Sequence, residues 1–174
     1  MQARRLRGQT VPAICRQYGC GYWERLCMSD LKLIALDAED LSILAAHLQD
    51  AVLRIEDMAY LKRERRFALV VNRFDWSDAA ASKGAGGQFL RRRTGVHFER
   101  VTGAQVQGLD LTNKSQALSL LTLTFEEGEA PQGTITLTFA GGGAVRIKVE
   151  CIEAALTDLG AAWTTSRKPE HAGD

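Results

Sequence analysis

His97 and Glu99 are the pair of side chains in this sequence whose types and spacing could serve acid–base catalysis. They stand two residues apart in a run of alternating apolar and polar residues. Both are therefore expected on one face of a strand, opposite Val96 and Phe98. A small hydrolase or transferase acting on an anionic substrate could use them. The pattern is more typical of two exposed polar residues on the solvated side of a sheet, so the sequence favours a non-enzymatic function.

Arginine side chains are concentrated in the middle of the chain. Residues 54–100 hold eleven basic and six acidic side chains, whereas residues 28–53 and 101–174 are both net acidic. Arginine beside aromatic side chains is a combination that recognises phosphate groups, nucleic acids and acidic proteins. A solvated rim, in which arginine stems cover apolar surface, would have the same composition. The candidate partner-binding residues are Arg66, Arg73, Trp76, Arg91, Arg92, Arg93 and Arg100.

The charge pattern indicates which partners this surface would suit. An acidic or phosphorylated protein, or a small anionic ligand, would match the basic segment. A long nucleic acid is not expected, because the acidic segments on either side would repel it. The apolar runs are only a few residues long, which excludes a helix crossing a membrane. Exposed sheet edges leave a homodimer as a further alternative.

The sequence predicts neither a metal site nor a bound cofactor. The spacing of Cys15, Cys20 and Cys27 lacks the paired C-x2-C ends of a zinc site, and no histidine precedes His47. The glycine triplet 141–143 lies between two alternating segments and has no helix after it. A hairpin turn therefore explains it better than a phosphate-binding loop.

Cys151 is the one cysteine outside the first 27 residues. It continues the alternation of Val145, Ile147 and Val149, which predicts a small buried apolar residue. A thiol without a partner suggests a reducing compartment, so the protein is expected in the cytoplasm.

Most of the elements that must position these residues have a period of two, which is typical of strands. One amphipathic helix is expected over residues 38–50, with Asp37 as its N-cap. A second, short helix is predicted from the spacing of Ile152, Ala155, Leu156 and Leu159, with Gly160 as its stop. Strands are expected at residues 31–36, 52–55, 58–62, 66–73, 94–101, 121–125, 134–139 and 145–150.

These elements predict an α+β fold. We expect a mostly antiparallel, strongly curved sheet or small barrel with an N-terminal helix and a short C-terminal helix. The alternative is a pleckstrin-homology-like barrel, because seven strands followed by a terminal helix have the same element order. The long βαβ alternation of a doubly wound nucleotide-binding fold is absent.

The chain divides into one domain and two tails. Residues 1–27 carry a net charge of +4 without hydrophobic periodicity. They are expected to be a disordered leader or an over-extended gene start, with the natural start at Met28. Residues 28–163 form the single α+β domain. Its glycine- and alanine-rich segment 77–90 is predicted to be a flexible loop, and residues 164–174 a polar tail.

Three strings of the sequence carry a resemblance to a known family: Asn72 to Trp76, Gly95 to Val101, and Phe139 to Arg146. With these strings the chain resembles a bacterial domain-of-unknown-function family, found chiefly among alphaproteobacteria, from about Leu31 to Trp163. The resemblance implies a small cytoplasmic protein with no established activity, ligand or catalytic residues. Departures from the family pattern are expected in the leader and around residues 79–88.

Overall fold

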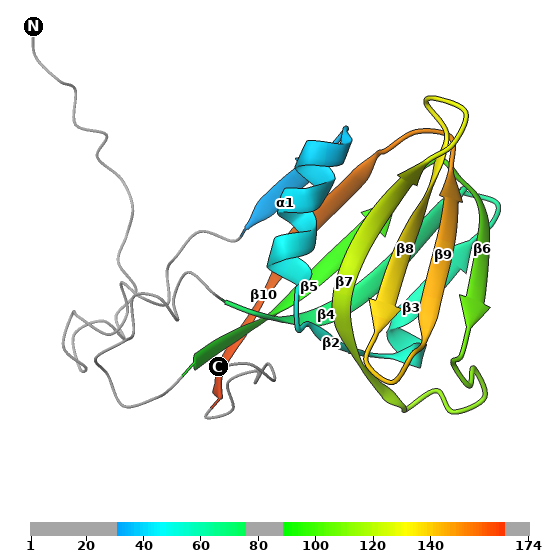
Figure 1. The fold of residues 1–174 in the computed structure, drawn as a ribbon. Helices are drawn as coiled ribbons and strands as arrows, with labels where there is room; N and C mark the ends of the chain where they lie inside the picture. Colours follow the sequence, from blue (N-terminus) through cyan, green and yellow to red (C-terminus); the bar gives the residue numbers. More distant parts are fainter. Residues whose placement is uncertain (1–30, 76–88, 166–174) are drawn as a thin grey trace, which may run out of the picture.

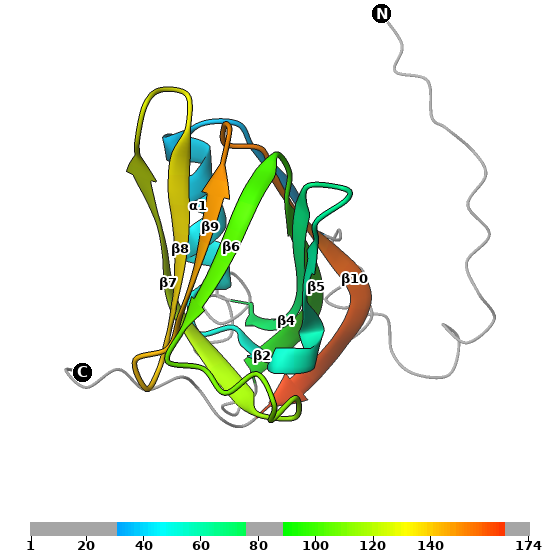
Figure 2. The same cartoon turned by 90° about the vertical axis from the view of Figure 1, so that its right-hand side faces the viewer.

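The computed structural model of the chain describes residues 31–75 and 89–165. In this part of the chain, ten antiparallel strands make one sheet in the order β1-β10-β5-β4-β2-β7-β8-β9-β6, with β3 also paired to β4. The sheet folds over on itself, and two layers result (Figures 1 and 2). The back layer contains β1, β10, β5, β4 and β3. The front layer contains β7, β8, β9 and β6, with the helix α1 beside β7.

The strands vary in length, from three residues in β2 to twelve in β10. Their order is β1 (Lys32–Ala35), α1 (Ala38–Leu48), β2 (Val52–Arg54), a 3-10 turn (Ile55–Asp57), β3 (Met58–Leu61), β4 (Arg66–Phe74), β5 (Phe89–Phe98), β6 (Val101–Gln107), β7 (Ala117–Glu127), β8 (Gly133–Phe139), β9 (Ala144–Val149) and β10 (Ala154–Thr165). The expected mostly antiparallel sheet with an N-terminal helix is confirmed. The sheet remains open, with β1 and β6 at its ends, and does not close into a barrel.

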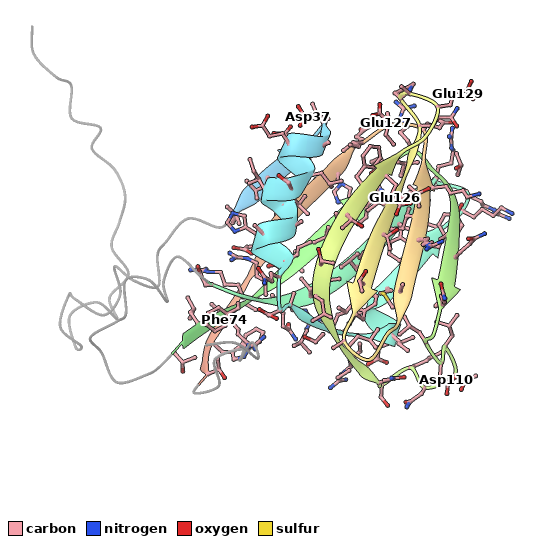
Figure 3. All side chains as sticks on the ribbon, viewed as in Figure 1. Asp37, Phe74, Asp110, Glu126, Glu127 and Glu129 are labelled. Atoms are coloured by element: carbon pink, nitrogen blue, oxygen red, sulfur yellow. The ribbon has the colours of Figure 1, made fainter. Side chains whose placement is uncertain are left out.

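The helix α1 forms as its sequence predicts. The Asp37 side chain accepts a hydrogen bond of 2.8 Å from the backbone N–H of Asp40 and caps the N-terminus (Figure 3). Leu41, Leu44 and Leu48 are buried between the helix and the sheet. The apolar face of the helix therefore closes one end of the core.

The hairpin of β8 and β9 also follows the sequence pattern. Phe139 and Val145 are fully buried in the core, as are their alternating apolar neighbours along both strands. The glycine triplet makes the turn between them, and Gly141 and Gly142 both have a φ of 86°. Residues with side chains rarely adopt this backbone conformation, which accounts for the glycines.

The predicted C-terminal helix is wrong, because residues 154–165 form strand β10. This strand pairs with β1 on one side and with β5 on the other. Ala154, Leu156 and Asp158 point into the interior, whereas Leu159 is exposed. Gly160 has a φ of 76° within a register shift and marks a β-bulge, not a helix stop.

The pleckstrin-homology-like alternative is wrong as well. It requires a closed barrel of seven strands, whereas the described residues form an open sheet of ten, and the segment predicted as its terminal helix is strand β10. Two outer strands, β1 and β6, also have a neighbour on one side only, so the barrel that this alternative requires is not formed.

Three smaller expectations need correction. The single strand expected at 94–101 is two strands, β5 and β6, separated by a tight connection in which Arg100 has a φ of 57°. Cys151 is partly exposed after the end of β9 instead of buried. The alternation over residues 121–125 predicts Leu121 on the buried face with Leu123, but Leu121 is 44% exposed because the register of β7 shifts between Leu120 and Thr122.

The predictions for the leader, the flexible loop and the polar tail concern residues that lie mostly outside the described part. The leader 1–27 is wholly outside it. Of the loop expected at 77–90, only residues 89 and 90 are described, and they belong to β5. Residues 164 and 165 of the expected tail belong to β10.

Candidate functional site

The three consecutive arginines of β5 point in alternating directions. Successive side chains of a strand lie on opposite faces of the sheet. Arg92 therefore shares the interior face with Thr94 and is buried, whereas Arg91 and Arg93 lie on the outer face of the back layer. The outer face is the side of the back layer away from α1. The same alternation on β4 puts Arg73 inside and Arg66 outside, and Trp76 lies outside the described residues.

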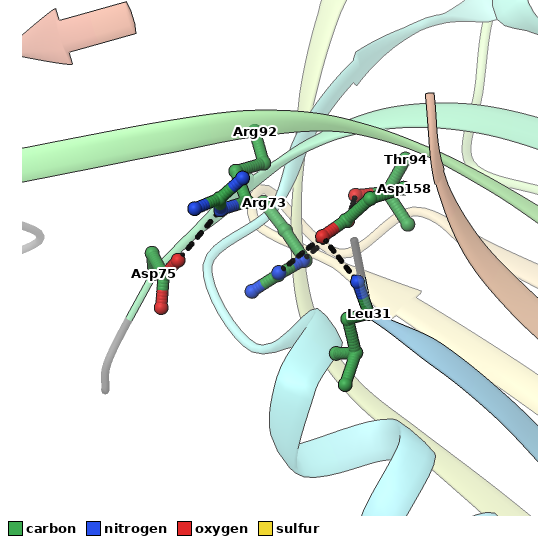
Figure 4. Close-up of polar contacts among 6 residues, drawn as sticks. All are labelled: Leu31, Arg73, Asp75, Arg92, Thr94 and Asp158. Atoms are coloured by element: carbon green, nitrogen blue, oxygen red, sulfur yellow. Dashed lines mark hydrogen bonds and ion pairs between the residues drawn. The ribbon is translucent and has the colours of Figure 1, made fainter. Parts of the chain in front are cut away.

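The buried Arg73 is held by a carboxylate on the neighbouring part of the sheet. Its Nε and Nη2 donate to the two carboxylate oxygens of Asp158 at 3.0 and 2.8 Å (Figure 4). Asp158 also accepts hydrogen bonds from the Thr94 hydroxyl at 2.6 Å and from the backbone N–H of Leu31 at 3.1 Å. One carboxylate thus connects β4, β5, β10 and the start of β1.

Arg92 makes a second buried ion pair close by. Its Nε donates to the Asp75 carboxylate at 2.8 Å, and both side chains are buried (Figure 4). Two charge pairs on the interior face are costly to desolvate, and the hydrogen bonds of the bidentate pair offset that cost. Arg73 and Arg92 therefore hold the sheet together and are not on the exposed surface.

Burial and neighbouring polar groups shift the pKa values of two groups near these ion pairs, Asp158 and His47. Burial by itself would raise the pKa of Asp158, but the hydrogen bonds from Arg73, Thr94 and Leu31 outweigh burial and lower it. The pKa of His47 on α1 is also lowered, first by burial and then by the charge of Arg73. Both groups are therefore held in the form that suits the buried Arg73: Asp158 charged and His47 neutral.

Arg91 has two aromatic cross-strand neighbours, of which Phe74 is fully buried and Trp163 is exposed. It pairs with Phe74 of β4 on one side and with Trp163 of β10 on the other. Its guanidinium carbon is 5.8 Å from the centre of the Phe74 ring, which is cation–π distance. Its Nη1 donates to the backbone oxygen of Asn72 at 3.4 Å. The result is a row of Phe74, Arg91 and Trp163 across three strands.

Arg93 lies on the same outer face, two residues after Arg91 on β5. Its side chain is 52% exposed, and among the described residues it makes one ion pair, in which Nη2 is 3.9 Å from Oδ1 of Asp57. An ion pair of that length at an exposed position contributes little to stability. Arg93 can therefore exchange this contact for one with a partner.

His97 and Glu99 line an open groove of about 600 Å³ at the other end of the outer face. Nε2 of His97 is 3.7 Å from Oε1 of Glu99, and the same oxygen accepts a hydrogen bond of 2.7 Å from Nε of Arg66. Arg100 belongs to the same groove and donates to Glu153 at 3.3 Å. Arg66, His97, Glu99 and Arg100 are thus brought together, away from Arg91 and Arg93.

The charges in this groove are largely compensated within the protein. Glu99 is committed to Arg66, Glu153 to Arg100, and Glu150 to Arg65. The described residues that line the groove supply neither a hydroxyl nor a thiol, so its chemistry would rest on His97 and the carboxylates, for example as a general base toward water. In the described ranges, no three His, Cys, Asp or Glu side chains gather into a group that could hold a metal ion.

Sequence reasoning missed Asp75, Asp158 and Trp163 as members of these clusters. Asp158 was included in the predicted C-terminal helix, so its inward position on a strand could not be inferred. Trp163 was expected at the end of the domain. The one available signal was the alternation from Ala154 to Asp158, which fits a strand as well as a helix.

In the part of the chain that the structure describes, the fold is an open antiparallel sheet with one α-helix. Over residues 31–171 the chain matches the family described as "Protein of unknown function (DUF2948)". This match covers most of the chain, so the protein belongs to that family, and the resemblance to a domain-of-unknown-function family is confirmed. No curated protein and no solved structure matches the chain. Among the described residues, no helix has the length and apolar character needed to cross a bilayer.

Proposed function

We propose that the protein is a non-enzymatic binding module whose outer face recognises an acidic or phosphorylated protein segment. The observation that carries this proposal is the exposed pair of Trp163 and Arg93 beside the partly buried Arg91, whose guanidinium lies against the buried ring of Phe74. Arginine is suited to this role because its planar guanidinium can donate two parallel hydrogen bonds to a carboxylate or phosphate.

The surroundings of Arg91 favour binding of an anion. Burial lowers the pKa of Arg91, and the charge of Asp50 opposes that change. Partial burial means that the guanidinium has already lost part of its water, and its contact with Phe74 restricts its rotation. Both effects lower the cost of ordering this side chain when a partner binds.

The test is a charge reversal at both outer arginines. We expect the double variant Arg91→Glu and Arg93→Glu to bind acidic and phosphoserine peptides at least about tenfold more weakly on a peptide array, because charge-assisted hydrogen bonds are lost. Wild-type binding should weaken as salt is raised, as ionic contacts require. Arg146→Glu is the matched control, since Arg146 is exposed on β9 of the other layer. Equal binding by the wild type and the double variant would refute the proposal.

The groove around His97 and Glu99 favours a second candidate function, hydrolysis of a small anionic substrate. A hollow of about 600 Å³ can hold such a molecule, and Arg66 and Arg100 could orient it. We expect His97→Ala to reduce turnover of a panel of phosphate and carboxylate esters by about 100-fold if this function is present. His47→Ala, which changes a histidine on α1, is the control. Absence of turnover by the wild type across the panel would end this candidate.

A further inference from the structure

A second groove lies at the end of the molecule where α1 begins. It has a volume of about 460 Å³ and is bordered by the β1–α1 corner, by β7 and by the link from β9 to β10. Its lining includes Phe125, Ile152 and Leu36, and Leu36 also borders the groove of His97 and Glu99. This groove is separate from the row of Phe74, Arg91 and Trp163, since it shares no residue with it.

The walls of this groove include several apolar side chains. Leu36 is 65% exposed, so its side chain is available for contact. The Phe125 ring lies directly over Gly133: a Cβ built at Gly133 would be 2.3 Å from the ring. Ile152 is buried beside them. The groove is thus a preformed apolar surface with one prominent leucine at its edge.

Among the described residues, the rim of this groove is acidic and has no basic side chain. Glu127 and Asp37 are part of the lining, and Glu126 and Glu129 belong to the same β7–β8 hairpin (Figure 3). Neither residues 33–53 nor residues 115–145 contain a lysine or arginine. In the described part of the chain, none of these four carboxylates makes an ion pair.

The local structure accounts for some of this negative charge but not for all of it. Asp37 caps α1, and Glu39 and Asp40 in its first turn interact favourably with the positive end of the helix dipole. The glutamates of the hairpin have no such partner, so Glu127 and Glu129 leave an excess of negative charge beside the apolar walls. A complementary occupant needs apolar side chains next to a lysine or arginine.

We propose that this groove docks a short segment of a partner protein in which apolar residues are interspersed with lysine or arginine. The apolar side chains would pack against Leu36 and Phe125, and the basic side chain would reach Glu127 and Glu129. This surface adds a second contact to the outer face of the proposed binding module and does not depend on it. The two surfaces together would allow the domain to hold a basic and an acidic partner at once.

The experiment uses a fluorescein-labelled octapeptide of alternating leucine and arginine as the probe, with binding followed by fluorescence anisotropy. We expect the full chain to bind this probe at least about tenfold more tightly than peptides in which glutamate replaces arginine or serine replaces leucine. The double variant Glu127→Arg and Glu129→Arg should lose at least about tenfold in affinity, and so should Leu36→Ser. All these positions are exposed, and thermal unfolding of each variant verifies that it is folded.

Matched controls lie near the opposite end of the molecule. Glu56→Arg changes an exposed carboxylate and Leu111→Ser an exposed leucine, and both should leave the affinity unchanged. Equal loss of affinity in controls and groove variants would overturn the proposal, as would equal binding of the arginine and glutamate peptides. A dimer of the chain alone that Glu127→Arg abolishes would also overturn it, because the occupant would then be a second copy. Arg91→Glu and Arg93→Glu should not affect this probe, which separates this test from that of the proposed function.

Discussion

Replacing Arg73 with methionine is expected to lower the free energy of unfolding by about 3–5 kcal/mol, as measured by urea denaturation followed by circular dichroism. Arg73 is only 3% exposed and gives two hydrogen bonds to Asp158. Methionine fills a similar volume but leaves the Asp158 carboxylate buried without its cation. The penalty is mostly that of an uncompensated buried charge, which exceeds the value of the ion pair itself.

The control for this prediction is an ion pair of the same kind at the surface. Arg54 and Glu56 are 3.2 Å apart, and their side chains are 61% and 46% exposed. Arg54→Met should therefore change the free energy of unfolding by about 1 kcal/mol or less. If the two variants lose equal stability, the buried pair does not have the role assigned to it.

The pH dependence gives an independent test of the same pair. The pKa of Asp158 is lower in the folded protein than its ordinary value, so the carboxylate stabilises the fold at neutral pH. This contribution is lost as the pH falls through the folded pKa, below the ordinary range of an aspartate. In Arg73→Met, burial raises the pKa of Asp158 and protonation removes the penalty. The stability difference between wild type and variant should therefore narrow from pH 7 to pH 3. A difference that stays constant would contradict this account.

The elements whose structure is determined by nearby residues in the sequence could be predicted. The helix α1 has a capping aspartate and an apolar face at helical spacing, and β8 and β9 alternate without interruption on both sides of a glycine turn. In these segments the local preference and the tertiary environment favour the same structure. The end of the chain differs, because the apolar positions from Ile152 to Leu159 fit a helix and a strand equally. This segment forms a strand because it pairs with β1 on one side and with β5 on the other.

The candidate site could be predicted only in part, for a related reason. A central cluster of arginines is visible in the sequence, and alternation separates Arg92 from Arg91 and Arg93 once the strand is known. The partner of Arg73 is not visible, since Asp158 lies 85 residues further along the chain. Composition therefore predicts that guanidinium groups gather near mid-chain. The topology determines which of them are neutralised by carboxylates.

The adjacent leucines of β7 should respond very differently to truncation, because a bulge separates them. Leu120 is 1% exposed and Leu121 is 44% exposed, and the register with β8 shifts between Leu120 and Thr122. We expect Leu120→Ala to lower the free energy of unfolding by about 2–5 kcal/mol, since it removes buried methyl groups and leaves a cavity. Leu121→Ala should change it by about 0.5 kcal/mol or less, as is usual at the surface.

Urea denaturation of the two variants measures both values under the same conditions, and each variant serves as the control for the other. If the alternation continued without a bulge from Leu123 toward the N-terminus, Leu121 would lie in the core and Leu120 in solvent. Leu121→Ala would then lose more stability than Leu120→Ala. The extra residue of the bulge reverses the faces of the preceding part of the strand. A larger loss in Leu121→Ala than in Leu120→Ala would show that β7 keeps the unbroken register. In that case the packing of Leu118 and Leu120 against the core would be wrong as well.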